Sequence, residues 1–222
     1  LDPNNLLNII RQTAIIAVVS VTMTFVLSTG EIDLSVGAVA GLASVVTAMA
    51  IDQFGIAGGI LCGLGTGVVV GAVNGWLTTA VGIPSFLTTL AMMGIARGAA
   101  MWVSGTAAIP ILSKTYTGVF GAGNLGPVPS LLIWVLVIGI AGHIVLRRTT
   151  FGRQVLATGG NETAARYSGV NTASIKFRVL MLSSIAAALA GMLYAGRLHS
   201  GRFQFGEGDE LSIIAAAVLG GT

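Results

Sequence analysis

The sequence is poor in charge and in cysteine. Charged residues make up 9% of its 222 residues, against about 25% in soluble domains. Hydrophobic residues make up 54% of the chain. A water-exposed surface needs more charged side chains than this chain has. The composition therefore indicates a polytopic membrane protein. Cys62 is the only cysteine, so no disulfide and no cysteine metal site can form within the chain.

The sequence also lacks the motifs of enzymes that hydrolyse ATP or cleave other bonds. It contains no Walker phosphate loop, no nucleophile elbow and no paired metal ligands. Its two histidines, His143 and His199, are expected at opposite ends of the membrane segments, so they form no metal site. We therefore expect no catalytic residue, no metal and no cofactor. An ATPase that drives transport would be a separate chain.

Most of the positive charge lies in one stretch, residues 147–178. This stretch contains one acid and six of the chain's 11 basic residues, namely Arg147, Arg148, Arg153, Arg166, Lys176 and Arg178. Because short loops rich in Lys and Arg stay in the cytoplasm, we predict that this stretch is cytoplasmic. The net charge of +3 then reports topology and not nucleic-acid binding. The loop 104–130, whose only charge is Lys114, is predicted to be external.

A short helix is predicted inside the basic stretch. Asn161 can cap its N-terminus, and Glu162 lies in the first turn, where the helix dipole favours an anion. Gly169 can end the helix in a left-handed conformation. Glu162 and Arg166 are four residues apart and can pair along one face. An ordinary solvated cytoplasmic loop is the alternative interpretation.

Apolar segments alternate with short polar ones along the rest of the chain. The apolar segments cover residues 12–28, 36–51, 55–78, 84–103, 131–146 and 177–195, with another from 211 onward. The polar break at 30–35 contains Glu31 and Asp33, so a broken helix is predicted there, with irregular backbone buried in protein or lining a cavity. Asp33 is predicted to cap the next helix, and a role as a substrate ligand is the alternative. Residues 197–210 are predicted to be a polar external loop.

A stripe of glycines runs along the segment 55–78, which is predicted to be a single helix. Glycine recurs at every fourth position, at Gly55, Gly59, Gly63, Gly67, Gly71 and Gly75. In a membrane helix such a stripe lets a neighbouring backbone approach closely, so it predicts a helix–helix contact. Asn74 lies beside the stripe and could hydrogen-bond across this contact or face a transport pathway.

The segment 84–103 begins with a partly polar face and contains one charge. Arg97 lies well inside it, where it would face a partner or a water-filled cavity, or else extend to the water at the outer end. Together with Asn74, the polar start of this segment predicts a translocation path. The residues predicted to line the path are Asn74, Phe86, Thr88 and Thr89.

A weak internal similarity indicates a repeat. IDLSVGAVAGL (32–42) aligns without gaps with DELSIIAAAVL (209–219). Five predicted crossings separate the two copies, so they would have opposite orientations, as in the inverted repeats of transporters.

Four motifs along the chain point to one family. They are GEIDLSVGAVAGLASVV (30–46), IPSFLTTLAMMGIARGAA (83–100), FGRQVLATGGNETAARYSGVNTASIK (151–176) and GEGDELSIIAAAVLGGT (206–222). Together they resemble the motifs of ribose-type ABC importer permeases, in the family's order and over nearly the whole chain. One departure is Glu31, which stands where the family usually has a second glycine before Ile32.

The resemblance implies an all-α, polytopic transmembrane helical bundle, similar to the cobalamin-importer-like permease fold. Residues 1–222 would form one permease domain, truncated at both ends relative to a longer permease, in the inner (plasma) membrane. This domain would translocate a monosaccharide or a similar polyol. A self-contained secondary transporter or channel is the alternative, although Glu31 and Asp33 are the only acids suited to ion coupling in the predicted spans.

The resemblance also implies partners: cytoplasmic ATPase subunits, an external sugar-binding protein, a second permease copy or paralogue, and membrane lipid. Residues 147–176 would be the cytoplasmic coupling loop, which contacts the ATPase through Asn161, Glu162, Ala164, Ala165, Arg166 and Gly169. The loops 104–130 and 196–210 would receive the binding protein. The charged candidates there are Arg197, Arg202, Glu207, Asp209 and Glu210.

Overall fold

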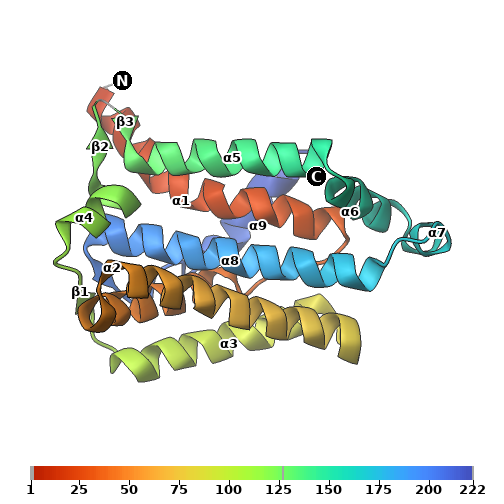
Figure 1. Ribbon diagram of the computed structural model, residues 1–222, viewed down its shortest axis with the longest axis horizontal. Helices are drawn as coiled ribbons and strands as arrows, with labels where there is room; N and C mark the ends of the chain where they lie inside the picture. Colours follow the sequence, from red (N-terminus) through yellow and green to blue (C-terminus); the bar gives the residue numbers. More distant parts are fainter. Residues whose placement is uncertain (1–2, 127, 222) are drawn as a thin grey trace.

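Long helices account for most of the computed structural model, which describes residues 3–126 and 128–221 (Figure 1). The long and medium helices are α1 (Pro3–Ser28), α2 (Val36–Trp76), α3 (Ser85–Ser104), α5 (Ser130–Arg148), α6 (Thr150–Gly160), α8 (Thr172–Leu198) and α9 (Asp209–Leu219). The short elements are the helices α4 (Lys114–Thr117) and α7 (Glu162–Tyr167), the π-helices η1 (Leu77–Val81) and η2 (Gly118–Ala122), and the strands β1 (Ile109–Pro110), β2 (Asn124–Leu125), β3 (Val128–Pro129) and β4 (Ser200–Gly201).

Among the described residues, four helical segments are long and apolar enough to cross a membrane. They are Val36–Val81, Ser85–Ser104, Ser130–Arg148 and Thr172–Leu198. The apolar part of α1, Thr13–Ser28, is shorter. In Figure 1, α8 lies at the centre of the bundle, with α1 and α5 on one side and α2 and α3 on the other. The predicted all-α, polytopic helical fold is therefore confirmed.

α2 consists of two helical legs, because the chain reverses direction at Gly55. With η1 it covers 46 residues, about 69 Å at a rise of about 1.5 Å per residue, which is more than twice the roughly 30 Å thickness of the bilayer core. Gly55 has φ 73° and ψ −176°, a conformation that glycine adopts without a Cβ clash. The two legs pack against each other, since Gly59 contacts Ile51 and Thr47. The reversal between the predicted segments 36–51 and 55–78 thus lies at Gly55, and the predicted helix 55–78 ends in η1.

The glycine stripe forms the predicted helix–helix contact. A Cβ added at Gly67 would lie 2.6 Å from the carbonyl oxygen of Ser184, and one added at Gly71 would lie 2.7 Å from Cα of Met181. Both contacts are to the backbone of α8, so no side-chain movement can relieve them. Hydrogen in place of a side chain is therefore what allows α2 and α8 to pack this closely.

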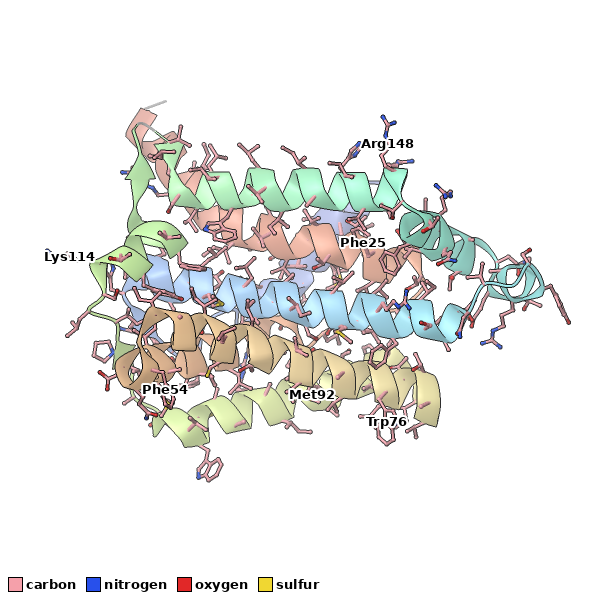
Figure 2. All side chains as sticks on the ribbon, in the orientation of Figure 1. Phe25, Phe54, Trp76, Met92, Lys114 and Arg148 are labelled. Atoms are coloured by element: carbon pink, nitrogen blue, oxygen red, sulfur yellow. The ribbon has the colours of Figure 1, made fainter. Side chains whose placement is uncertain are left out.

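The loop 104–130 and the basic stretch lie at opposite ends of the bundle, as predicted. Lys114 and Arg148 mark the two ends in Figure 2. The loop carries more structure than predicted, because it contains α4, η2 and the antiparallel pair β2 with β3, and its strand β1 pairs antiparallel with β4 from outside the loop. It also packs on α8: the hydroxyl of the buried Tyr116 donates to the carbonyl oxygen of Met192 at 3.0 Å.

The segment 200–206 differs from the predicted external loop, because it runs down into the bundle beside the first leg of α2. Gly201 lies against the backbone of Ser44, and Gly206 lies against Gly37. From Gly37 to Ser44 a helix rises roughly 10 Å, so the segment descends by about that much. Its two ends, at Gly201 and Gly206, are buried against α2, whereas Arg202 and Gln204 between them are exposed.

α9 starts where this segment ends and runs toward the opposite end of the bundle from the first leg of α2 (Figure 1). Its first turn lies beside Gly37, and its end, at Gly220 and Gly221, lines one groove with Ser28 and Arg147. The two similar sequences, 32–42 and 209–219, therefore each enter a helix inside the bundle and then run in opposite directions. This arrangement meets the geometric requirement of an inverted repeat.

Candidate coupling and translocation site

The predicted short helix is present as α7, beyond the end of the bundle (Figure 1). Asn161 caps it, because its Oδ1 accepts a hydrogen bond from the backbone N–H of Ala164 at 2.9 Å. Gly169 has φ 85°, the left-handed conformation predicted for the exit turn. Ala165 is buried, whereas Tyr167 is 90% exposed. The helix therefore has one face on the protein and one face in solvent.

Glu162 joins α7 to the start of α8. Its Oε1 accepts from Arg166 Nη2 at 2.6 Å, which is the predicted pair four residues apart, and from Thr172 Oγ1 at 3.1 Å. Its Oε2 accepts from Lys176 Nζ at 2.8 Å. These hydrogen bonds, that from Lys176 first, lower the pKa of the Glu162 carboxyl although partial burial opposes them. The Glu162 carboxylate therefore binds α7 to the first turns of α8, through Arg166 on one side and Thr172 and Lys176 on the other.

α6 lies in the predicted coupling loop 147–176, where the sequence predicts only the short helix that begins at Asn161. Thr149 begins the helix by accepting from the N–H of Gly152 at 3.2 Å. Gly159 lies against the carbonyl oxygen of Ser28, so α6 packs on the end of α1. A threonine cap followed by buried Val155 and Thr158 is a signal for this helix that the sequence does contain.

The break between α1 and α2 is held by side chains from α3. The N–H of Ile32 donates to Ser85 Oγ and the N–H of Leu34 donates to Thr89 Oγ1, both at 3.1 Å. Two buried backbone groups of the irregular segment 29–35 therefore have partners. Within the segment, Asp33 Oδ1 accepts from the N–H and the hydroxyl of Ser35, at 2.9 and 2.6 Å.

The predicted role of Asp33 as the cap of α2 is only approximately right. The N-cap residue is Ser35, and its own side chain makes no capping hydrogen bond. Asp33 is fully buried and orders the turn just before the helix. The physical reason is that Asp33 lies two residues before the N-cap Ser35, so its carboxylate is bound by Ser35 itself and not by the N–H groups of the first helical turn.

Three of the four predicted translocation residues lie near this segment. Asn74 is fully buried, and its Nδ2 donates to Ser35 Oγ at 3.1 Å. Thr89 is also fully buried and contacts the segment directly. Thr88 is buried, and its hydroxyl has no hydrogen-bond partner among the described residues. Phe86, in contrast, is 47% exposed on the surface of α3.

The charged residues predicted to receive a binding protein lie at two depths. Near the outer end, Arg197 Nη1 donates to the carbonyl oxygen of Arg11 at 3.2 Å, and Arg202 is exposed. Deeper, beside the start of α2, are Glu207, Asp209 and Glu210.

The deeper acids contact the walls of the bundle. Glu207 forms an ion pair with Arg97 of α3, so Arg97 faces a partner inside the protein. Asp209 Oδ2 accepts from the hydroxyl of Tyr194 at 2.5 Å. Glu210 reaches the first turn of α2, where its Oε2 lies 2.8 Å from the position that a Cβ on Gly37 would occupy.

Four helical segments able to cross a membrane, with polar side chains buried between them, define a multi-pass membrane protein over the described residues, and the proteins it is similar to are transport permeases. Residues 5–222 match the family described as the permease component of branched-chain amino acid transport systems, and the chain belongs to this family. No solved structure matches the chain, so the likeness to the cobalamin-importer fold stays a prediction.

Curated relatives cover the whole chain. It is 38% identical over 224 residues to a ribose import permease protein of Bacillus subtilis, covering 100% of this chain and 70% of that protein. It is 37% identical over 227 residues to an L-arabinose ABC transporter permease protein of Azospirillum brasilense, covering 100% of this chain and 65% of the relative. An inner membrane ABC transporter permease protein of Escherichia coli K12 is 39% identical over 224 residues, with 97% and 66% covered.

Proposed function

We propose that this chain is the membrane permease of an ATP-driven importer and passes a monosaccharide or a similar polyol. The observation that carries this proposal is the similarity over the full chain to permeases named for ribose and arabinose import. A separate chain would hydrolyse ATP, since the sequence contains no phosphate-binding loop.

We infer that α7 contacts the ATPase as a coupling helix. Its position beyond the end of the bundle and its exposed face around Tyr167 support this role (Figure 1). The capped start at Asn161 and the turn at Gly169 hold a defined shape that can be moved as a rigid unit.

The other surfaces would serve the remaining partners. The loop 104–130 and the outer residues Arg197 and Arg202 would receive the binding protein, while the exposed apolar residues of α3 and α5 would contact lipid or a second permease. Translocation would pass the polar cluster around Asn74, Thr88 and Thr89. With Phe86 on the outer surface of α3, a path role for it would need a partner chain against that surface.

Reconstitution tests the proposal. The full-length permease would be purified with the proteins that co-purify, and sugar uptake into proteoliposomes would be measured for D-ribose and L-arabinose with ATP. We expect an ATPase partner and ATP-dependent uptake. Uptake by the purified permease alone, driven by an ion gradient, would support the alternative of a self-contained secondary transporter and overturn the proposal.

The coupling role of α7 has its own test. Arg166→Glu places a second acid beside Glu162 in place of a 2.6 Å ion pair, so it should weaken ATPase assembly or the stimulation of ATP hydrolysis by sugar-loaded binding protein. Docking of the binding protein on the outer face should persist. Arg178→Glu, at an exposed site on α8, makes the same charge change outside the site. Wild-type stimulation of ATP hydrolysis in Arg166→Glu would exclude a coupling role for α7 and favour the alternative of an ordinary solvated segment.

A further inference from the structure

Lys176 holds two carboxylates that come from different parts of the chain. Its Nζ lies 2.8 Å from Glu31 Oε1 and 2.8 Å from Glu162 Oε2. The side chains of Glu31 and Lys176 are only 12% and 19% exposed. Because solvent screens such a shielded pair less than a surface pair, this contact is stronger and more dependent on geometry than an ordinary surface ion pair.

The two carboxylates lead to two different sites. Glu162 is the first residue of α7 and is fixed there by Arg166 and Thr172. Glu31 belongs to the irregular segment 29–35, which reaches α3 through Ser85 and Thr89.

The same segment reaches the second leg of α2, through the hydrogen bond between Asn74 and Ser35. The two ion pairs of Lys176, the chain from Glu31 to Ser35 and the hydrogen bond from Asn74 therefore connect α7 to the buried cluster at the predicted translocation path.

From this geometry we propose that the Glu31–Lys176 ion pair is the positioning contact that transmits movement of α7 to the buried segment 29–35. The inference rests on the proposed role of α7 as the coupling helix. When the ATPase shifts α7, Glu162 shifts with it. The Nζ atom of Lys176 then moves closer to one of its two carboxylates, Glu31 or Glu162, and away from the other. The electrostatic field at Glu31 and the restraint on its side chain change, and the segment 29–35 then moves α3 relative to α2.

Glu31 is the residue that makes this link particular to the present chain. Glycine, which similar permeases usually have at this place, has no side chain to reach Lys176. Without Glu31, α7 would still be tied to α8 through Glu162, but the segment 29–35 would lose its ionic contact with that assembly. Glu31 and Lys176 are thus positioning residues and need not touch the sugar.

The test measures sugar taken up per ATP hydrolysed by the full-length permease in proteoliposomes, with its co-purifying ATPase and a binding protein loaded with D-ribose or L-arabinose. Glu31→Gln should lower this ratio at least about fivefold, the lower end of typical coupling effects. Glu31→Gly removes the carboxylate without adding a polar group and should give the same loss. The folded yield and ATPase co-purification should match the wild type, so that a lower ratio reports lost coupling and not lost assembly.

A double-mutant cycle makes the pair itself the object of the test. Lys176→Met removes the contacts with both Glu31 and Glu162 and should also lower the ratio. Glu31→Gln added to it should cause little further loss, because the Glu31–Lys176 contact is already absent. Matched controls are Asp52→Asn and Arg178→Met, which alter exposed charges outside the series of contacts.

Two results would overturn the inference: a wild-type ratio in Glu31→Gln and Glu31→Gly, or losses that simply multiply in the double variant. Arg166→Glu separates the two levels of the argument. If Arg166→Glu uncouples ATP hydrolysis from uptake while the Glu31 variants do not, the proposed role of the Glu31–Lys176 pair is wrong, and the role of α7 as the coupling helix is retained. If it also behaves as the wild type, the proposed coupling helix itself fails.

Discussion

At the scale of single residues, the end of the bundle that carries α7 depends on a few local polar contacts. Asn161 satisfies one N–H at the start of α7, and Glu162 concentrates the ion pairs of this end on one carboxylate. A helix of six residues has little stability of its own in water, because nucleation is costly and few intrahelical bonds repay it. Removing either side chain should therefore loosen α7 before it affects the membrane helices.

Asn161→Ala should open α7 more often. Loss of the cap costs about 1 kcal/mol, which corresponds to roughly fivefold faster hydrogen exchange of the amides after it. Exchange would be followed by mass spectrometry of the purified permease, with Asn161→Ser as the control that keeps a capping oxygen. Equal exchange in Asn161→Ala and the wild type would contradict a stabilising cap.

The stability that Glu162 provides should depend on pH. Its folded pKa is lowered, chiefly by the hydrogen bond from Lys176, so its contribution is present above the unfolded value of about 4.3 and is lost as pH falls through the lower folded value. A carboxyl 13C titration of Glu162 should give a pKa below that of an ordinary glutamate. Lys176→Met should move it upward, whereas Arg178→Met should leave it in place. An unchanged titration in Lys176→Met would exclude Lys176 as the main cause.

At the scale of elements, close helix contact and irregular backbone share the same need for glycine. The second leg of α2 lies directly on the backbone of α8 along its glycine stripe. Gly55 reverses α2, and the irregular segments 29–35 and 200–206 bring non-helical chain into the bundle. These glycines and irregular segments place the first turns of α2 and α9 side by side.

Gly67→Leu should prevent folding of the permease or sharply reduce its folded yield. A Cβ at this site would lie 2.6 Å from a backbone oxygen of α8, so α2 and α8 would have to separate. Gly65→Leu is the matched control, since a Cβ there meets nothing within 4 Å. Yield would be measured by fluorescence-detected size exclusion of a tagged permease. Normal yield and transport in Gly67→Leu would show that the contact is dispensable.

At the scale of the whole molecule, charge and structure divide the bundle into two unlike ends. One end has the loop 104–130 with its small sheets, and the other has α6, α7 and most of the Lys and Arg residues (Figures 1 and 2). The bias of Lys and Arg sets orientation, so the end with α7 is expected in the cytoplasm.

Labelling in intact cells tests this topology. Single cysteines at Thr163 and at Leu112, which is 89% exposed in the loop 104–130, would be introduced in a Cys62→Ala background and exposed to a membrane-impermeant thiol reagent. We expect labelling at position 112 only, with both positions labelled after the cells are permeabilised. Labelling at 163 but not at 112 in intact cells would reverse the orientation.

Local and compositional properties of the sequence by themselves determined much of this protein. Apolar runs predicted the membrane helices, and fourfold glycine spacing predicted the contact that α2 makes. Asn161, Glu162, Arg166 and Gly169 predicted α7, because caps, turns and pairs four residues apart act between neighbours in the chain.

Only the tertiary structure decided which distant groups meet. The partner of Glu31, the partner of Arg97, the descent of residues 200–206 beside α2 and the packing of α6 on α1 all join segments far apart in sequence. Such contacts arise because buried polar groups must find partners wherever the packed helices bring them together. The periodicity of one segment contains no information about which other segment will supply that partner.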